Sequence, residues 1–213
     1  MKVHKQISIL MDLNITGSTG LLIWWFLFPI VLPISDATEN FQNLILDKNW
    51  TWLNLVGLVS CLLLCLGLPG IYLAHLRDYR KLGFIGILIS FGGLILFTAI
   101  QYYETLIWPA VAHTNPELLQ TNGLLVSGNP GVLAGLLASG IILGIGYILF
   151  GMAALRTKKY NKTAILLLMT GAVVFGNGIV FSARTIGLLL FCSGTIWLSH
   201  LIKKAQSGKR KLQ

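Results

Sequence analysis

One long uncharged segment, residues 129–156, constrains this chain more than any other feature of its sequence. The segment reads NPGVLAGLLASGIILGIGYILFGMAALR, and its first charged residue is Arg156. A helix rises about 1.5 Å per residue, so about 20 apolar residues cover the hydrocarbon core of a bilayer. Pro130 suits the first turn of a helix, where its missing N–H is not needed. The segment therefore predicts a helix that crosses a membrane.

Small residues lie on two opposite faces of this predicted helix, if successive residues turn by about 100°. One face holds Gly131, Gly135, Ala138, Ser139, Gly146 and Ala153, and the other holds Gly140, Gly144 and Gly151. Small residues let membrane helices approach closely, so each face can accept a neighbour. We therefore expect the helix over 130–155 to be the central and most buried helix of a bundle. We also expect leucine at Gly135 or Gly144 to disrupt packing.

Composition extends this prediction to the whole chain. Of the 213 residues, 55% are hydrophobic and only 11% are charged, whereas soluble domains are about 25% charged. The mean hydropathy is +0.77. A soluble fold of this size has too little polar surface to cover so many apolar residues. We predict an all-α, polytopic membrane protein, with residues 1–213 forming one bundle of six transmembrane helices. The predicted spans are 15–34, 53–76, 82–112, 130–155, 163–183 and 186–202.

Lys and Arg residues lie almost entirely in alternate loops. Of the 16, fourteen fall before the first span, between the second and third, between the fourth and fifth, or after the sixth. The other two are Lys48 and Arg184. Cytoplasmic loops of membrane proteins are enriched in Lys and Arg. We therefore expect both termini to be cytoplasmic and the protein to lie in the plasma membrane. The net charge of +9 then reflects topology, and we expect no nucleic-acid partner.

Polar residues near the end of the third predicted span form a candidate binding site. Glu104 lies 22 residues past the start of that span, about 33 Å along a straight helix and therefore at the outer interface. Gln101 and Trp108 lie three residues before and four after it, on the same helix face. Arg184, in the predicted turn between the last two spans, is the expected partner of Glu104. Asn177 lies seven residues before Arg184 and completes the predicted cluster.

No pattern in the sequence indicates a catalytic centre, a metal site or a cofactor. Cys61, Cys65 and Cys192 lie inside apolar spans, and their spacing does not match that of a zinc site. No nucleophilic triad or phosphate-binding loop is present. We therefore expect a non-catalytic protein that binds or passes a small or lipid-like molecule, or that serves as an accessory subunit. The alternatives are a membrane-embedded enzyme acting near Glu104 and a purely structural or assembly protein.

The layout resembles that of a group of small, uncharacterised bacterial membrane proteins with six helices. The resemblance rests on the segment 103–112, YETLIWPAVA, and on the last helix, which begins RTIGLLL at Arg184. It covers most of the chain and implies a bacterial plasma membrane location, with the lipid bilayer as the main partner. A small hydrophobic ligand or a second membrane subunit is the further partner we expect. The resemblance implies no activity.

Overall fold

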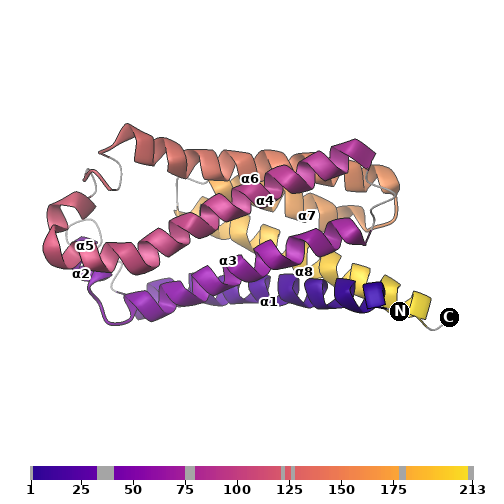
Figure 1. The fold of residues 1–213 in the computed structure, drawn as a ribbon, viewed down its shortest axis with the longest axis horizontal. Helices are drawn as coiled ribbons and strands as arrows, with labels where there is room; N and C mark the ends of the chain where they lie inside the picture. Colours follow the sequence, from indigo (N-terminus) through magenta and orange to yellow (C-terminus); the bar gives the residue numbers. More distant parts are fainter. Residues whose placement is uncertain are drawn as a thin grey trace.

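The computed structural model describes residues 2–32, 41–74, 80–120, 123–125, 128–177 and 181–210, which are helical almost throughout (Figure 1). The α-helices are α1 (Lys2–Val31), α2 (Phe41–Ile45), α3 (Trp50–Leu73), α4 (Arg80–Tyr102), α5 (Trp108–Thr114), α6 (Pro130–Thr157), α7 (Lys162–Asn177) and α8 (Phe181–Arg210). A π-helix, η2 (Tyr103–Ile107), joins α4 to α5, and a short 3-10 helix, η3 (Pro116–Leu119), follows α5. The prediction of an all-α protein is confirmed.

Five helices in the described part of the chain are long and apolar enough to cross a bilayer. They span Val3–Val31, Trp50–Leu73, Lys81–Thr114, Pro130–Thr157 and Ser182–Ser207. Helix α7 is also apolar, but it has 16 residues over its described length, about 24 Å against a hydrocarbon core of about 30 Å. The structure therefore agrees with a polytopic membrane protein, and six spans stay a prediction.

Two helix boundaries differ from the sequence-based prediction. Helix α1 begins at Lys2 rather than near residue 15, and the polar residues that interrupt its apolar stretch are accommodated within the fold. Asp12 forms an ion pair with Lys203, and Asn14 is buried against Gly67, where a Cβ would lie 2.6 Å from the Asn14 Cγ. Helix α8 begins at Phe181, so Arg184 lies in its first turn and not in an interhelical turn.

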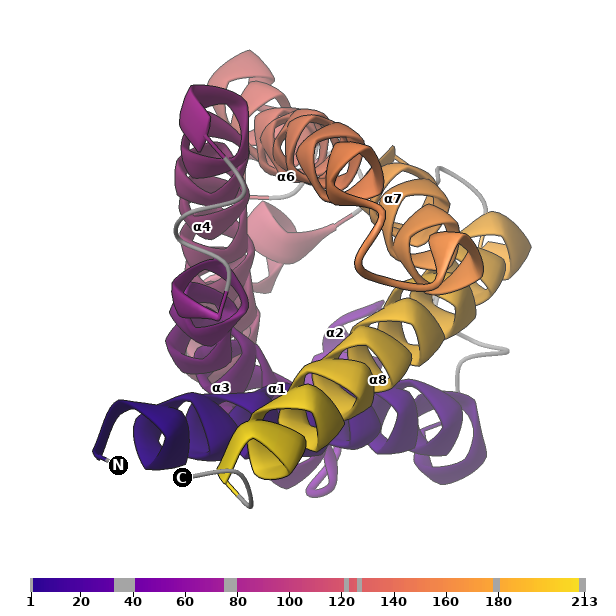
Figure 2. The same cartoon turned by 90° about the vertical axis from the view of Figure 1, so that its right-hand side faces the viewer.

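The six longer helices form a closed ring in the order α1, α3, α4, α6, α7 and α8, with α8 returning to α1 (Figure 2). This arrangement contradicts the prediction that the helix over 130–155 is central. Helix α6 does have its two expected neighbours, α4 and α7. It nevertheless occupies one position in the ring. In its most apolar stretch of 18 residues, 33% of the residues are buried, against 50% in the corresponding stretches of α3 and α8. The two faces of small residues on α6 therefore indicated that a helix packs on each side of it, but they did not indicate that α6 lies at the centre of the bundle.

Glycines allow close backbone contact between neighbouring helices. At the α4–α6 seam, a Cβ on Gly93 would lie 2.6 Å from the Leu143 Cα. At the α6–α7 seam, Gly176 and Gly140 face each other, and a Cβ on Gly176 would lie 2.7 Å from the Gly140 carbonyl oxygen. Side chains at these positions would separate the helices, because interiors packed this closely do not absorb added volume.

The two glycines at which we expected leucine to disrupt packing are not the tight ones. A Cβ on Gly135 would have no atom within 4 Å, and the nearest atoms to a Cβ on Gly144 would lie 3.4 Å away, an ordinary contact distance. The tight glycines on α6 are Gly140, Gly146 and Gly151. The prediction for Gly135 is therefore wrong, because this part of α6 has no close neighbour.

Side-chain hydrogen bonds close the ring between α1 and α8. The Trp25 indole N–H donates to the Thr185 hydroxyl at 2.8 Å. Near the termini, the His4 ring is hydrogen-bonded to the Gln206 amide, and Lys203 pairs with an acid on α1. The first and last helices of the chain are thus fastened along their length, and both termini lie at the same end of the bundle (Figure 1).

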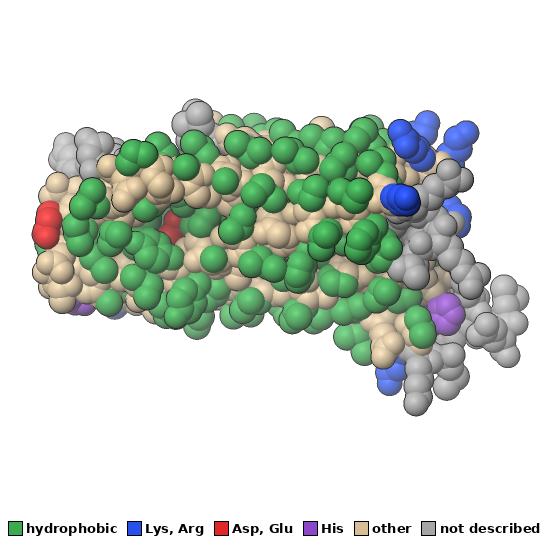
Figure 3. Space-filling model, turned by 45° about the horizontal axis from the view of Figure 1, so that its top comes forward, with side chains coloured by type: hydrophobic (Ala, Val, Ile, Leu, Met, Phe, Trp, Pro, Cys, Tyr) green, Lys and Arg blue, Asp and Glu red, His purple; other side chains and the backbone are tan. Residues whose placement is uncertain are grey.

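Charged side chains divide the molecule into two ends. Lys and Arg gather at the end that carries the termini, and the flanks between the ends are covered with hydrophobic side chains (Figure 3). We call the first the basic end; its exposed residues include Lys81, Lys158, Lys159 and Lys204. The other is the opposite end, where α1 finishes and where α3, α6 and α8 begin.

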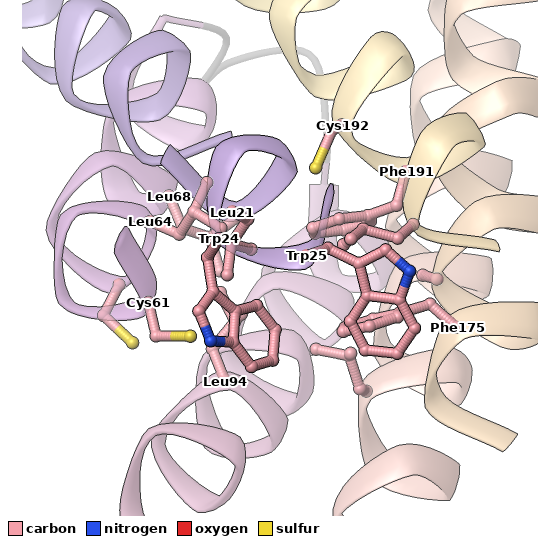
Figure 4. Close-up of a cluster of buried hydrophobic side chains, with 14 of the residues drawn as sticks. Leu21, Trp24, Trp25, Cys61, Leu64, Leu68, Leu94, Phe175, Phe191 and Cys192 are labelled. Carbon is pink, nitrogen blue, oxygen red and sulfur yellow. The ribbon is translucent and has the colours of Figure 1, made fainter. Parts of the chain in front are cut away.

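Aromatic side chains pack inside the ring. Trp24 and Trp25 leave α1 toward different neighbours, Trp24 toward α3 and Trp25 toward α8 (Figure 4). Phe191 of α8 stacks with Phe175 of α7 at a centroid distance of 6.3 Å, and Tyr147 of α6 meets Phe191 edge-on at 5.2 Å. Tyr147 and Phe191 thereby bridge α6 and α8, which are not neighbours in the ring, so the middle of the ring is a packed core.

Candidate functional site

A π-helix places Glu104, the acidic residue of the predicted site. Proline has no N–H, so Pro109 cannot donate to the carbonyl four residues before it and disturbs the preceding turn. The chain responds by widening: the Trp108 N–H donates to the Tyr103 carbonyl, five residues back. Such π-turns inside α-helices often occur at functional sites. Here the wide turn lies inside a helix that is long enough to cross a membrane.

This widened turn leaves the Glu104 carbonyl without a donor from its own helix. The Trp108 N–H is directed to Tyr103, and the next candidate, Pro109, has no N–H. The Trp50 indole N–H fills the gap and donates to the Glu104 carbonyl oxygen at 2.9 Å. A residue at the start of α3 therefore fixes the backbone that carries the Glu104 carboxylate.

Gln101 is bonded to the Glu104 side chain, as the shared helix face predicted. Its Nε2 donates to the Glu104 Oε2 at 3.2 Å, and the Gln101 side chain is 3% exposed. The other amide atom, Oε1, is buried and has no hydrogen-bond donor among the described residues. It points at Gly57 of α3, where a Cβ would lie 2.8 Å from it. An unpaired buried carbonyl typically costs about 1–3 kcal/mol, so this side of the site lacks a donor.

Trp24 and Asn54 extend the polar cluster toward α1 and α3. The Trp24 indole N–H donates to the Asn54 Oδ1 at 3.3 Å, and the Asn54 Nδ2 donates to the Trp50 carbonyl at 3.0 Å. Asn54 is 1% exposed. We did not predict either residue, although an amide in the apolar α3 and a tryptophan pair in α1 were visible signals in the sequence.

Trp108 lies beside the cluster in an aromatic group and not on the Gln101–Glu104 bond. Its ring stacks on Trp50 at a centroid distance of 6.2 Å and meets Phe41 edge-on at 5.4 Å. Its indole N–H has no acceptor of normal hydrogen-bond geometry among the described residues, and the Tyr103 hydroxyl is the polar group with which it interacts. Trp108 therefore acts on the site indirectly: its ring packs on Trp50, whose indole N–H donates to the Glu104 carbonyl.

Arg184 approaches the same carboxylate from α8. It lies in the first turn of that helix, its side chain is exposed, and its charge acts electrostatically on Glu104. Glu104 itself is half-buried. An acid from η2 and a base from α8 thus interact electrostatically at the opposite end of the ring.

Asn177 is not joined to this cluster by any contact that the structure describes. Its Nδ2 donates to the Val173 carbonyl of its own helix at 2.9 Å and reaches the Gly140 carbonyl of α6 at 3.5 Å. The amide therefore bonds the α6–α7 seam. Its position seven residues before Arg184 in the sequence did not bring it to Glu104.

Helices α4 and α6 separate toward the opposite end. They are in contact from Gly86 to Gly93 on α4, after which α4 crosses the molecule toward α3 (Figure 1). None of residues 130–138, the first turns of α6, is buried. The space-filling view shows a recess on this side, with an acidic side chain inside it (Figure 3). The two helices therefore leave an opening beside the half-buried Glu104.

The arrangement combines an acid, a base, an unpaired amide carbonyl and several indole rings in an otherwise apolar protein. Within the described ranges, no three His, Cys, Asp or Glu side chains are grouped as a metal ion would require. Comparisons with protein-family models, with curated proteins and with solved structures found no match to this chain. The chemistry of the site therefore rests on its own residues, which suit binding of a polar group attached to an apolar molecule.

Proposed function

We propose that this chain is a multi-pass membrane protein of the bacterial plasma membrane that binds a small amphiphilic molecule and does not catalyse a reaction. The observation that carries the proposal is the Glu104 carboxylate, half-buried on a π-helix within an apolar span and held by Gln101 and Trp50. Ionisable residues inside membrane spans are costly and usually serve binding or transport. An opening beside the carboxylate gives such a ligand a path to it.

The basic end is cytoplasmic in this proposal, because Lys and Arg are enriched in cytoplasmic loops. Both termini are then inside the cell, and the Glu104 site lies in the outer half of the membrane. All six of α1, α3, the α4–η2–α5 helix, α6, α7 and α8 cross the bilayer in this arrangement, with α7 as the shortest. The bilayer is the main partner, and a second membrane subunit is an alternative partner.

A thermal-shift assay tests the proposed function. The detergent-purified protein is heated with a panel of single-chain amphiphiles that carry cationic, zwitterionic, anionic or neutral headgroups. A ligand that binds only the folded state raises the melting temperature as its concentration passes its Kd. At least one class is expected to raise the melting temperature of the wild type and of Glu117→Gln, but not that of Glu104→Gln. Glu117 is an exposed acid in η3 and serves as the matched control.

Equal shifts in the wild type and Glu104→Gln, for every amphiphile, would contradict ligand binding at this site and favour the structural or assembly alternative. Chemical conversion of an added amphiphile by the wild type, detected by mass spectrometry and lost in Glu104→Gln, would instead favour the enzyme alternative.

A further inference from the structure

The α6 side of the opening is apolar. Residues 130–138 of α6 carry only apolar or small side chains, and none of these residues is buried. Side chains of this kind offer alkyl surfaces and no hydrogen-bonding groups. Gly135 lies among the α6 residues, and nothing fills the space beside it within 4 Å of a Cβ position. An alkyl chain can therefore lie along this part of α6 without displacing any side chain.

The polar groups at the inner end of the opening call for a hydrogen-bond donor with a positive charge. Glu104 supplies a carboxylate, which accepts hydrogen bonds and attracts cations. The Gln101 Nε2 donates to this carboxylate, whereas the Gln101 Oε1 points at Gly57 of α3. A primary ammonium carries three N–H donors. Placed at Glu104, it can donate to the acceptor positions of the carboxylate that Gln101 does not occupy.

Arg184 adds a requirement for a negative group close to that ammonium. Its exposed guanidinium acts electrostatically on Glu104, so the two charges are near each other. Arginine binds phosphate through two parallel hydrogen bonds, which makes it a preferred phosphate partner. A headgroup that fits the pair therefore has an ammonium and a phosphate separated by a short linker.

We propose that the opening between α4 and α6 binds an outer-leaflet phospholipid with a primary ammonium in its headgroup, with the ammonium at Glu104, the phosphate at Arg184 and an acyl chain along α6. This inference rests on the proposed function and names the ligand class for that site. The three features are independent: an apolar start of α6 beside the opening, a half-buried carboxylate, and a base that acts electrostatically on it.

Native mass spectrometry of the purified protein with defined phospholipids tests the proposal. The lipids share acyl chains and differ in the headgroup: phosphatidylethanolamine has the primary ammonium, phosphatidylcholine has the same charges without N–H donors, and phosphatidylglycerol has no ammonium. The wild type is expected to retain phosphatidylethanolamine at least about 12-fold more than phosphatidylcholine, because each lost charge-assisted hydrogen bond is worth about 1.5 kcal/mol or more. Phosphatidylglycerol is expected to bind more weakly still.

Three variants assign the parts of the headgroup and the chain. Glu104→Gln is expected to remove the preference for phosphatidylethanolamine over phosphatidylcholine, and Arg184→Gln to weaken the binding of both. Gly135→Phe fills the opening and is expected to reduce binding without loss of the folded state, since no atom lies near that position. Gly92→Phe is the matched control: it too has open space, but it lies 12 residues before Glu104, about 18 Å along the helix.

The outcomes separate this inference from the proposed function. Binding that depends on Glu104 but does not distinguish phosphatidylethanolamine from phosphatidylcholine overturns the ligand class and leaves amphiphile binding in place. Retention that Gly135→Phe and Gly92→Phe reduce equally overturns the path along α6. No Glu104-dependent binding of any phospholipid or single-chain amphiphile overturns both. If Glu104→Gln does not fold, the unsubstituted protein and Arg184→Gln still decide the headgroup preference.

Discussion

The indole N–H of Trp50 donates to the backbone carbonyl of Glu104 at 2.9 Å and so joins the first residue of α3 to the π-helix. The bond exists because Pro109 interrupts the helical hydrogen-bond ladder and leaves that carbonyl without an internal donor. A backbone defect in one helix is therefore repaired by a side chain from another. This hydrogen bond fixes the backbone of Glu104 and therefore the position of its carboxylate near the opposite end of the ring.

Replacing Trp50 with phenylalanine tests this repair. Trp50→Phe keeps an aromatic ring against Trp108 but leaves the Glu104 carbonyl unpaired, so the free energy of unfolding is expected to fall by about 1–3 kcal/mol. Unfolding in mixed micelles with increasing denaturing detergent measures the change. Trp52→Phe is the matched control, because Trp52 is exposed and bonds to the nearby Asn49 side chain. Equal losses in the two variants would show that the Trp50 bond has no special role.

Leucine substitutions on α6 distinguish its packed seam from its open end. Gly140→Leu is expected to destabilise the fold by about 1–3 kcal/mol or more, because the residue meets Gly176 backbone to backbone. Gly135→Leu is expected to change the free energy of unfolding by less than about 0.5 kcal/mol, as surface substitutions usually do. The same detergent titration measures both. A large loss at Gly135 would mean that a neighbour covers this part of the helix.

A double-mutant cycle measures the coupling between Glu104 and Arg184. The losses in Glu104→Gln and Arg184→Gln are expected to be non-additive by about 0.5–1 kcal/mol, a modest value because Arg184 is exposed. Thermal melts of the two single variants and the double variant provide the data. A second cycle, in which Glu117→Gln replaces Glu104→Gln, should be additive. Additive losses in the first cycle as well would show that the two charges do not stabilise the fold as a pair.

Single cysteines report which end of the bundle faces the cytoplasm. In a variant with alanine at Cys61, Cys65 and Cys192, a cysteine at Glu117 is expected to react with an impermeant maleimide added to intact cells. A cysteine at Lys159 is expected to react only after the membrane is opened, because the basic end faces inward. Both native positions are exposed, so either result is interpretable. Labelling of intact cells at Lys159 alone would reverse the proposed topology.

The helices themselves could be predicted from the sequence, because apolar length and interrupting charges are local properties. The ring could not. Small residues on α6 indicate that neighbours approach on both faces, but Gly140 and Gly135 look alike until the partner helix is known. The position of a helix within a bundle depends on every other helix, and glycine spacing carries no information about that.

The candidate site was predicted in part for the same reason. Gln101 and Glu104 are neighbours along one helix, so their spacing alone brings them together. Asn177 depends on the direction of α7 relative to α6, and it bonds that seam instead. The contribution of Trp50 could not be predicted. Its indole N–H donates to a backbone carbonyl that lacks a helical donor because Pro109 has no N–H, and the sequence does not show which side chain lies near that carbonyl.

The seam between α1 and α8 has a consequence for how the protein assembles. Helices enter the membrane in chain order during synthesis. The hydrogen bond from Trp25 of α1 to the Thr185 hydroxyl therefore cannot form until α8 has been inserted. Until then the indole N–H faces lipid or a transient partner. Closure of the ring between α1 and α8 therefore follows the insertion of α8. In the closed ring every long helix has two neighbours, so the order of the helices around the ring does not depend on which of them comes first in the chain. A version with its termini joined and a new break between α6 and α7 should therefore reach the same ring.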